Sequence, residues 1–212
     1  MFGHRLPELR RAELLERGAD EVRLTAATLF APALGSLGGI VPHEGLLTPP
    51  ELEELAGTIA GRPELWEPLV REDPERRRYE LLYEDARMDA WVLSWMPGQA
   101  TGFHDRYVSG VGIAVALGSV REDWLRYGGD HVEWQLRPGD TRNGGPGYIH
   151  RVQHLDGEPA VTIHVYSPPL DWVGQYRIDE EGIVRREVQP GRRELTPQLI
   201  AEGALAGVLE RF

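Results

Sequence analysis

Histidines on alternating segments are the residues of this chain best suited to chemistry. The chain has seven histidines, and four fall on segments that predict inner strands. Neutral imidazole is the commonest metal ligand in proteins and also serves as an acid or base. The four are His104, His150, His154 and His164. We assign no role to the other three, His4, His43 and His131, which lie in loop-like contexts.

The first of these segments, residues 97–118, has the sequence PGQATGFHDRYVSGVGIAVALG. A glycine, five further residues and His104 precede a predicted strand that ends at Gly118. Side chains alternate across a strand, so positions 104 and 106 share a face and a metal site here would use both. Position 106 is an arginine, which is always charged and has no lone pair to give a metal.

The second segment, residues 139–154, places His150 at a strand start after a proline-glycine turn, and His154 follows four residues later. A metal site and a pair of ordinary interior histidines are both open on these residues alone. The third segment, PAVTIHVYSPPL, puts Thr162, His164 and Tyr166 on one face of a strand. Buried imidazoles and tyrosine hydroxyls need partners, so the three predict either a polar relay at a site or a structural hydrogen-bond ladder.

Helices are expected mainly before these segments. Amphipathic spacing predicts helices over residues 7–17 and 22–33, and a glycine-rich stretch follows at 35–45. Residues 48–60 begin with threonine, proline and, three residues after the threonine, glutamate, which is a capping box with proline at the first helical position. Shorter helices are expected over 63–71 and, at the C-terminal end, from Thr196.

From about Tyr79 the period changes to alternation, and turn residues separate short strands, including a hairpin turn at Asp156-Gly157. Many short strands of this kind predict an antiparallel sandwich or barrel. The expected strands are ELLYED, MDAWVLSWM, VGIAVALGSV, HVEWQL, YIHRVQHL, AVTIHVYS and QYRIDEEGIVRREV.

Composition narrows the possible partners. The net charge of −11 argues against nucleic acid. The absence of cysteine excludes disulfides, thiolate metal sites and a cysteine nucleophile. We find neither a signal peptide nor an apolar run of the roughly 18 residues that a membrane span needs. We therefore expect a cytoplasmic protein, monomeric or homodimeric, with no nucleic-acid or membrane partner.

Three blocks, SWMPGQATGFHDR, GYIHRVQH and EPAVTIHVYSPPL, resemble the successive signature blocks of cysteine dioxygenases and related bacterial thiol dioxygenases. The resemblance covers about residues 77–180. It implies a mainly β cupin fold, an antiparallel jelly-roll-like barrel with N-terminal helices and a short C-terminal helix. We expect a single structural domain, with helices in 1–76 packing on a barrel over 77–190, and a helical tail over 191–212.

The resemblance also implies a reaction. Family members hold one non-haem Fe(II) by three histidines and add both atoms of O₂ to a thiol, which gives a sulfinate. His104 and His150 match the first and third metal ligands, and Arg106 falls at the second. The implied substrate is a small cysteine-like thiol or mercapto acid.

Other family positions match further residues. Thr162, His164 and Tyr166 match the family's Ser-His-Tyr relay, whose tyrosine hydroxyl reaches substrate and oxygen. Val111 matches the cysteine that many members link to that tyrosine, so no such link forms here. The arginine that binds the substrate carboxylate is expected at Arg78, with Arg77 as the neighbouring candidate.

Arg106 leaves three outcomes open. Iron, or another divalent metal, is held by His104 and His150 alone; or another side chain such as His154 completes the site; or metal is lost and Arg106 binds an acid group. The corresponding functions are a thiol dioxygenase, a cupin enzyme with different metal chemistry (an isomerase or tailoring enzyme), and a non-enzymatic carboxylate-binding cupin.

Overall fold

A computed structural model describes residues 45–126 and 131–191. Contacts divide the chain into two units, Met1–Gly39 and Ile40–Phe212, and every described residue belongs to the second. The helices expected over 7–17, over 22–33 and from Thr196 lie outside the described residues. No helix in the described part of the chain is long and apolar enough to cross a membrane.

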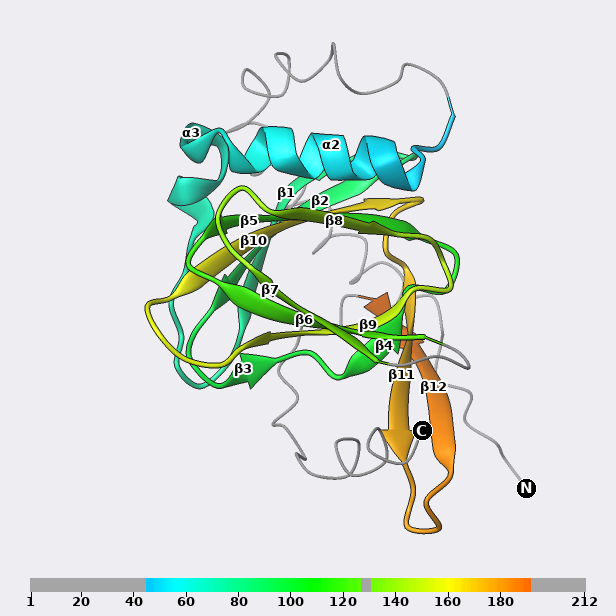
Figure 1. The fold of residues 1–212 in the computed structure, drawn as a ribbon. Coiled ribbons are helices and arrows are strands. Elements are labelled where there is room, and N and C mark those ends of the chain that lie inside the picture. Colours follow the sequence, from blue (N-terminus) through cyan, green and yellow to red (C-terminus); the bar gives the residue numbers. More distant parts are fainter. Residues whose placement is uncertain (1–44, 127–130, 192–212) are drawn as a thin grey trace, which may run out of the picture. The chain divides into compact units, whose positions relative to one another are not determined.

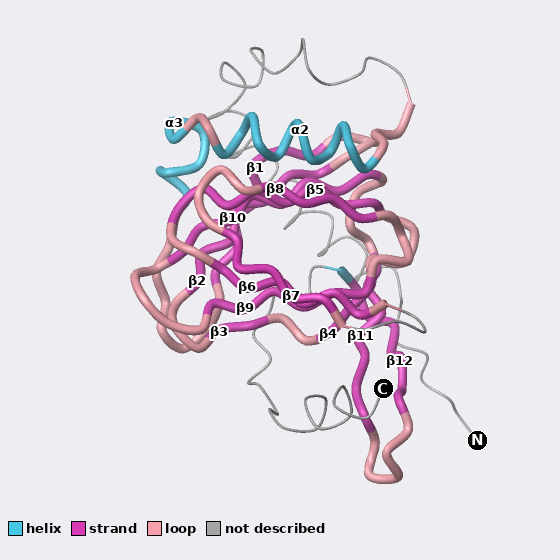
Figure 2. The backbone as a smooth tube through the Cα atoms, in the orientation of Figure 1, coloured by secondary structure: helices cyan, strands magenta, loops and turns pink. Residues whose placement is uncertain are grey.

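Two antiparallel sheets face each other, which confirms the predicted mainly β cupin barrel (Figures 1 and 2). The first sheet contains, in order, β1 (Arg78–Glu84), β2 (Asp89–Trp95), β10 (Ala160–Ser167), β5 (Gly110–Leu117) and β8 (Thr141–Gly144). The second contains, in order, β12 (Val184–Pro190), β11 (Trp172–Ile178), β4 (Phe103–Asp105), β9 (Ile149–His154), β6 (Val120–Leu125) and β7 (Val132–Leu136), and the short β3 (Gln99–Ala100) pairs with β9.

The expected strand over 104–118 differs from the structure. It is broken into β4 and β5, which belong to different sheets. Between them Tyr107 takes a φ of +58°, and Ser109 N–H donates to the Arg106 carbonyl 3.0 Å away, so the chain turns here. Arg106 therefore follows the strand instead of lying on its face. The last expected strand, over 175–188, is likewise a hairpin of β11 and β12.

Helix α2 (Pro49–Ala60) lies across the outer face of the first sheet (Figure 1). Its predicted capping box is present: the Thr48 backbone N–H and hydroxyl donate to a Glu51 carboxylate oxygen at 2.7 and 2.6 Å. Four apolar side chains are buried from this helix, namely Leu52, Leu55, Ala56 and Ile59. The expected short helix after it is α3 (Pro63–Trp66) followed by a 3₁₀ turn, Glu67–Leu69.

The helix covers one face of β10, so its other face is free to carry polar groups. All eight residues of β10 and all seven of β2 are buried. β10 runs between β2 and β5, in antiparallel register with both. This central position, covered by α2 on one side and by the second sheet on the other, is where the relay residues lie.

Gly112 of β5 packs directly against the backbone of α2. A Cβ atom added at this position would lie 2.1 Å from both the carbonyl carbon and the oxygen of Leu52. Gly112→Ala must therefore push helix and sheet apart. We expect it to lower the free energy of unfolding by about 1–3 kcal/mol, measured by denaturant titration. Gly145→Ala is the control, because nothing lies within 4 Å of its added Cβ. Equal stability of the two variants would contradict this packing.

Candidate active site

His104 and His150 lie side by side inside the barrel. His104 is on β4 and His150 is on β9, and the two are register partners across these antiparallel strands. Their ring centroids are 4.7 Å apart, and both residues are buried. The Nδ1 atom of His104 lies 2.9 Å from the Gly102 carbonyl oxygen. The short β4 positions the His104 imidazole, and the proline-glycine turn before β9 positions that of His150 beside it.

Arg106 reaches the same point from the turn after β4. Its residue exposure is only 1%, and its Nη2 donates to Nε2 of His150. The guanidinium carbon lies 5.4 Å from the centroid of the Tyr166 ring, in the geometry of a cation–π contact. The Nε and Nη1 atoms of Arg106 have no hydrogen-bond partner among the described residues. The barrel therefore encloses the charged Arg106 guanidinium, which still has hydrogen-bond donors available for a ligand.

Glu122 of β6 completes a chain with these two residues. One of its carboxylate oxygens lies 2.5 Å from Nδ1 of His150. Because Nε2 accepts a hydrogen bond from Arg106, the imidazole carries its proton on Nδ1 and donates it to Glu122. Burial, and then the charge of Arg106, holds the pKa of His150 well below its usual value. Burial raises the pKa of Glu122 to about 7, although a hydrogen bond with Tyr148 and then the charges of Arg106 and Arg142 oppose the shift.

The relay of β10 is formed as a continuous hydrogen-bonded chain. Thr162 Oγ1 accepts from the indole Nε1 of Trp95 at 2.9 Å and lies 3.0 Å from Nε2 of His164. Nδ1 of the same imidazole lies 3.0 Å from the Tyr166 hydroxyl. Burial first, and then the charges of Arg106 and Arg77, lower the pKa of His164 well below its usual value, so it is neutral.

Tyr166 is the register partner of Val111 across β10 and β5. The cysteine-matching position therefore faces the tyrosine directly, but valine has no thiol to link with it.

Arg77, just before β1, and Arg78, the first residue of β1, differ in burial. The Arg78 side chain is 44% exposed, and its Nη2 lies 2.7 Å from a carboxylate oxygen of Asp73. Arg77 is only 3% exposed, its guanidinium carbon lies 4.9 Å from the Trp95 ring centroid, and its charge acts on His164. Successive residues point to opposite sides of a strand, which explains why one is inside and one outside.

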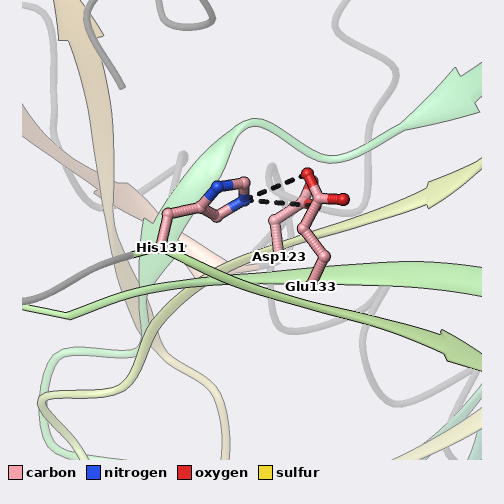
Figure 3. A group of neighbouring side chains, drawn as sticks. All are labelled: Asp123, His131 and Glu133. Atoms are coloured by element: carbon pink, nitrogen blue, oxygen red, sulfur yellow. Dashed lines mark hydrogen bonds and ion pairs between the residues drawn. The ribbon is translucent and has the colours of Figure 1, made fainter. Parts of the chain in front are cut away.

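The sequence did not predict a second group of side chains that could bind a metal ion. Asp123, His131 and Glu133 offer ligand atoms within 4.8 Å of one another (Figure 3). His131 lies just before β7 and Glu133 lies on it, and Glu133 pairs in register with Asp123 of the neighbouring β6. The spacing of His131 and Glu133 was the sequence signal that could have revealed the group. The Asp123 carboxylate is also held by Arg121 at 3.1 Å and by Arg151 at 2.8 Å. Two guanidiniums already pair with the buried Asp123, so we interpret the group as an ion-pair network on the second sheet, of which Glu133 is the exposed end.

The family model of cysteine dioxygenase type I matches residues 27–179, which include every residue of this site. The chain belongs to this family. Its membership agrees with the barrel, with the relay and with the paired histidines.

Similar solved structures are more distant. TT1209 from Thermus thermophilus is 24% identical over 49% of this chain and 93% of that chain, with a TM-score of 0.44. A double-stranded β-helix protein from Klebsiella pneumoniae is 20% identical over 48% and 80% of the two chains, with a TM-score of 0.43. A cupin superfamily protein from Desulfitobacterium hafniense is 12% identical over 49% and 87%, with a TM-score of 0.42.

The residues present do not fit the family's three-histidine iron centre. Two imidazoles, His104 and His150, stand where three are required, and the Nε2 lone pair of His150 faces the Arg106 guanidinium. His154, whose Nδ1 lies 2.8 Å from the Ser119 carbonyl oxygen, does not replace the third. Within the described part of the chain it forms no three-ligand group with His104 and His150.

Thr162 holds the relay together through two bonds, so its hydroxyl should matter more than its shape. Thr162→Val keeps the volume but leaves Trp95 Nε1 and His164 Nε2 buried without their partner. We expect a loss of about 2 kcal/mol or more in the free energy of unfolding. Thr162→Ser keeps the hydroxyl and should cost about 1 kcal/mol for the lost methyl group. Equal losses in denaturant titrations would show that the relay contributes nothing.

Acid should destabilise the fold through His164. Because its folded pKa is lowered, the unfolded chain binds a proton below about pH 6.5 that the folded chain does not, while above that pH the difference vanishes. Stability should fall by as much as about 1.4 kcal/mol per pH unit from this residue as pH drops below 6.5. His164→Gln should show a correspondingly shallower decline between pH 6.5 and 5. Parallel curves would contradict a neutral, buried His164.

Proposed function

We propose that the barrel interior binds a small carboxylic acid of the cysteine or mercapto-acid type, with Arg106 as the group that binds the carboxylate. One observation carries this proposal. The Arg106 side chain is fully buried, yet its Nε and Nη1 atoms have no hydrogen-bond partner among the described residues. Buried guanidinium donors are costly unless they are paired, and a carboxylate matches their fork geometry with two parallel hydrogen bonds.

Electrostatics of the surrounding groups supports an anionic ligand. Arg77 brings a second buried guanidinium, and its charge acts on His164. Burial and the charge of Arg106 lower the pKa of both His150 and His164 and keep them neutral, and Arg77 adds to the shift at His164. The charge of Arg106 acts on the Glu122 carboxyl, whose pKa of about 7 leaves it only partly ionised at neutral pH. A carboxylate ligand would supply the missing negative charge.

Tyr166 supports the thiol part of the proposal. Its ring lies beneath the Arg106 guanidinium, and its hydroxyl is fixed by His164. An acid bound at Arg106 would therefore have a rigid, neutral hydrogen-bonding group beside it. In the family this tyrosine reaches a thiol substrate, which is why we choose a mercapto or amino acid over other carboxylates.

Calorimetric titration of the metal-free protein tests the proposal. The ligands are 3-mercaptopropionate and cysteine, with cysteamine as a thiol that has no carboxylate. We expect the two acids to bind and cysteamine to bind at least about tenfold more weakly, since a charge-assisted hydrogen bond contributes about 1.5–3 kcal/mol. Binding of all three with equal affinity, or of none, would overturn the proposal.

Replacement of the two buried arginines should weaken acid binding. For Arg106→Gln and Arg77→Gln we expect a loss of about 10- to 100-fold in affinity for 3-mercaptopropionate. Arg78→Gln is the matched control, because the Arg78 side chain is exposed and paired with Asp73. If Arg78→Gln weakens binding and Arg77→Gln does not, the choice of the inner arginine is wrong. Circular dichroism of each variant checks that it is folded.

The family's activity, oxidation of a small thiol to a sulfinate with Fe(II) and O₂, is the second candidate. The specific observation in its favour is the intact relay from Thr162 to Tyr166, with His104 and His150 nearby. Elemental analysis of freshly purified protein and O₂ uptake with cysteine, 3-mercaptopropionate and cysteamine decide between the candidates. We expect little bound metal and no uptake. Stoichiometric iron with thiol-dependent uptake would establish the oxygenase instead.

A further inference from the structure

Three buried residues, Glu122, His150 and Arg106, form a hydrogen-bonded line from β6 through β9 to the turn after β4. Glu122 accepts from Nδ1 of His150 at 2.5 Å, and Nε2 of the same ring accepts from Arg106 Nη2. Glu122 and His150 have no measurable exposure, and Arg106 has 1%. The direction of the line is fixed, because an imidazole whose Nδ1 donates presents its lone pair at Nε2.

A carboxylate that fixes an imidazole so that its other nitrogen faces a cation is the arrangement found behind metal-ligating histidines. Here the cation is a guanidinium. We infer that Arg106 is a built-in cation in the place of a metal ion at His150, and that Glu122 is the positioning residue that fixes His150 toward it. Beyond binding an acid, the site would then exclude a divalent metal ion.

Exclusion of metal follows from the same contacts. A divalent ion at Nε2 of His150 would have to displace Arg106 from its hydrogen bond, and would then lie a few ångströms from a permanent positive charge in a poorly hydrated interior. His104, whose ring is 4.7 Å from that of His150, could share the ion, but the described residues offer no group of three ligands that includes these two histidines. The Glu122 carboxyl is on the far nitrogen of His150 and cannot reach the ion without breaking the line.

Removal of the guanidinium should therefore open a metal site. Co²⁺ is the probe, because its bound form has a visible spectrum. The titration compares wild type with Arg106→His, which supplies a third imidazole, and with Arg106→Ala, which only removes the charge. All carry His131→Ala, so that the group of Asp123, His131 and Glu133 contributes no binding. We expect Arg106→His to bind one Co²⁺ at least about 100-fold more tightly than wild type, with Arg106→Ala between them.

Glu122 is tested in the background that binds metal. Adding Glu122→Gln to Arg106→His should weaken Co²⁺ binding by about 10- to 100-fold, because the carboxylate no longer orients His150. Glu133→Gln, which alters a half-exposed carboxylate on the neighbouring strand, is the control and should leave binding unchanged. A purely structural role for Glu122 would lower thermal stability without changing the Co²⁺ affinity of the protein that stays folded.

The Co²⁺ titrations and the acid titrations can fail independently of each other. If wild type binds one Co²⁺ within about threefold of the Arg106→His affinity, the inference is overturned, whatever acids bind. If wild type excludes Co²⁺ but binds no mercapto acid, the inference stands and the proposed function fails. Should Arg106→His not fold, the comparison of Arg106→Ala with wild type makes the same decision, and equal weak binding by both would also count against the inference.

Discussion

We propose that a single hydrogen bond, from the guanidinium of Arg106 to Nε2 of His150, determines which ligands this barrel can bind. The bond holds the permanent positive charge of Arg106 in an interior between two packed sheets. Such a charge is tolerated only where neighbours are neutral or opposite in charge. The neutral imidazoles of His150 and His164 and the carboxyl of Glu122 meet that condition within the protein. A carboxylate ligand on the remaining donors would complete it.

The scaffold around this bond is that of the cysteine dioxygenase family, and it remains in place. The relay, its support from Trp95 and the register of Tyr166 against Val111 all lie in the first sheet beneath α2. Arg106 lies outside that sheet, in a turn. The chemical difference that we propose therefore depends on a residue in a turn, and not on the packed first sheet that positions the relay.

Much of this arrangement could be predicted from the sequence because it is local. Alternation alone placed Thr162, His164 and Tyr166 on one face, and the capping box at Thr48 located the start of α2. Family positions then brought His104 and His150 together, which no spacing within either segment could have done.

The remainder depends on contacts between distant strands. Glu122 gave no signal, since its partner His150 is 28 residues away on a neighbouring strand. Alternation placed Arg106 beside His104 on one strand face. In the structure the strand ends at Asp105, and it is the following turn that places the Arg106 side chain near His104. Which of Arg77 and Arg78 is buried depended on the register of β1, which sequence alone leaves open by one residue.

The most direct test of the central claim is a crystal structure of the protein produced with ample iron, with anomalous diffraction measured at the iron absorption edge. We predict no anomalous peak beside His150, with the Arg106 guanidinium within hydrogen-bond distance of Nε2. An anomalous peak bonded to His104 and His150, with Arg106 turned away, would contradict the claim.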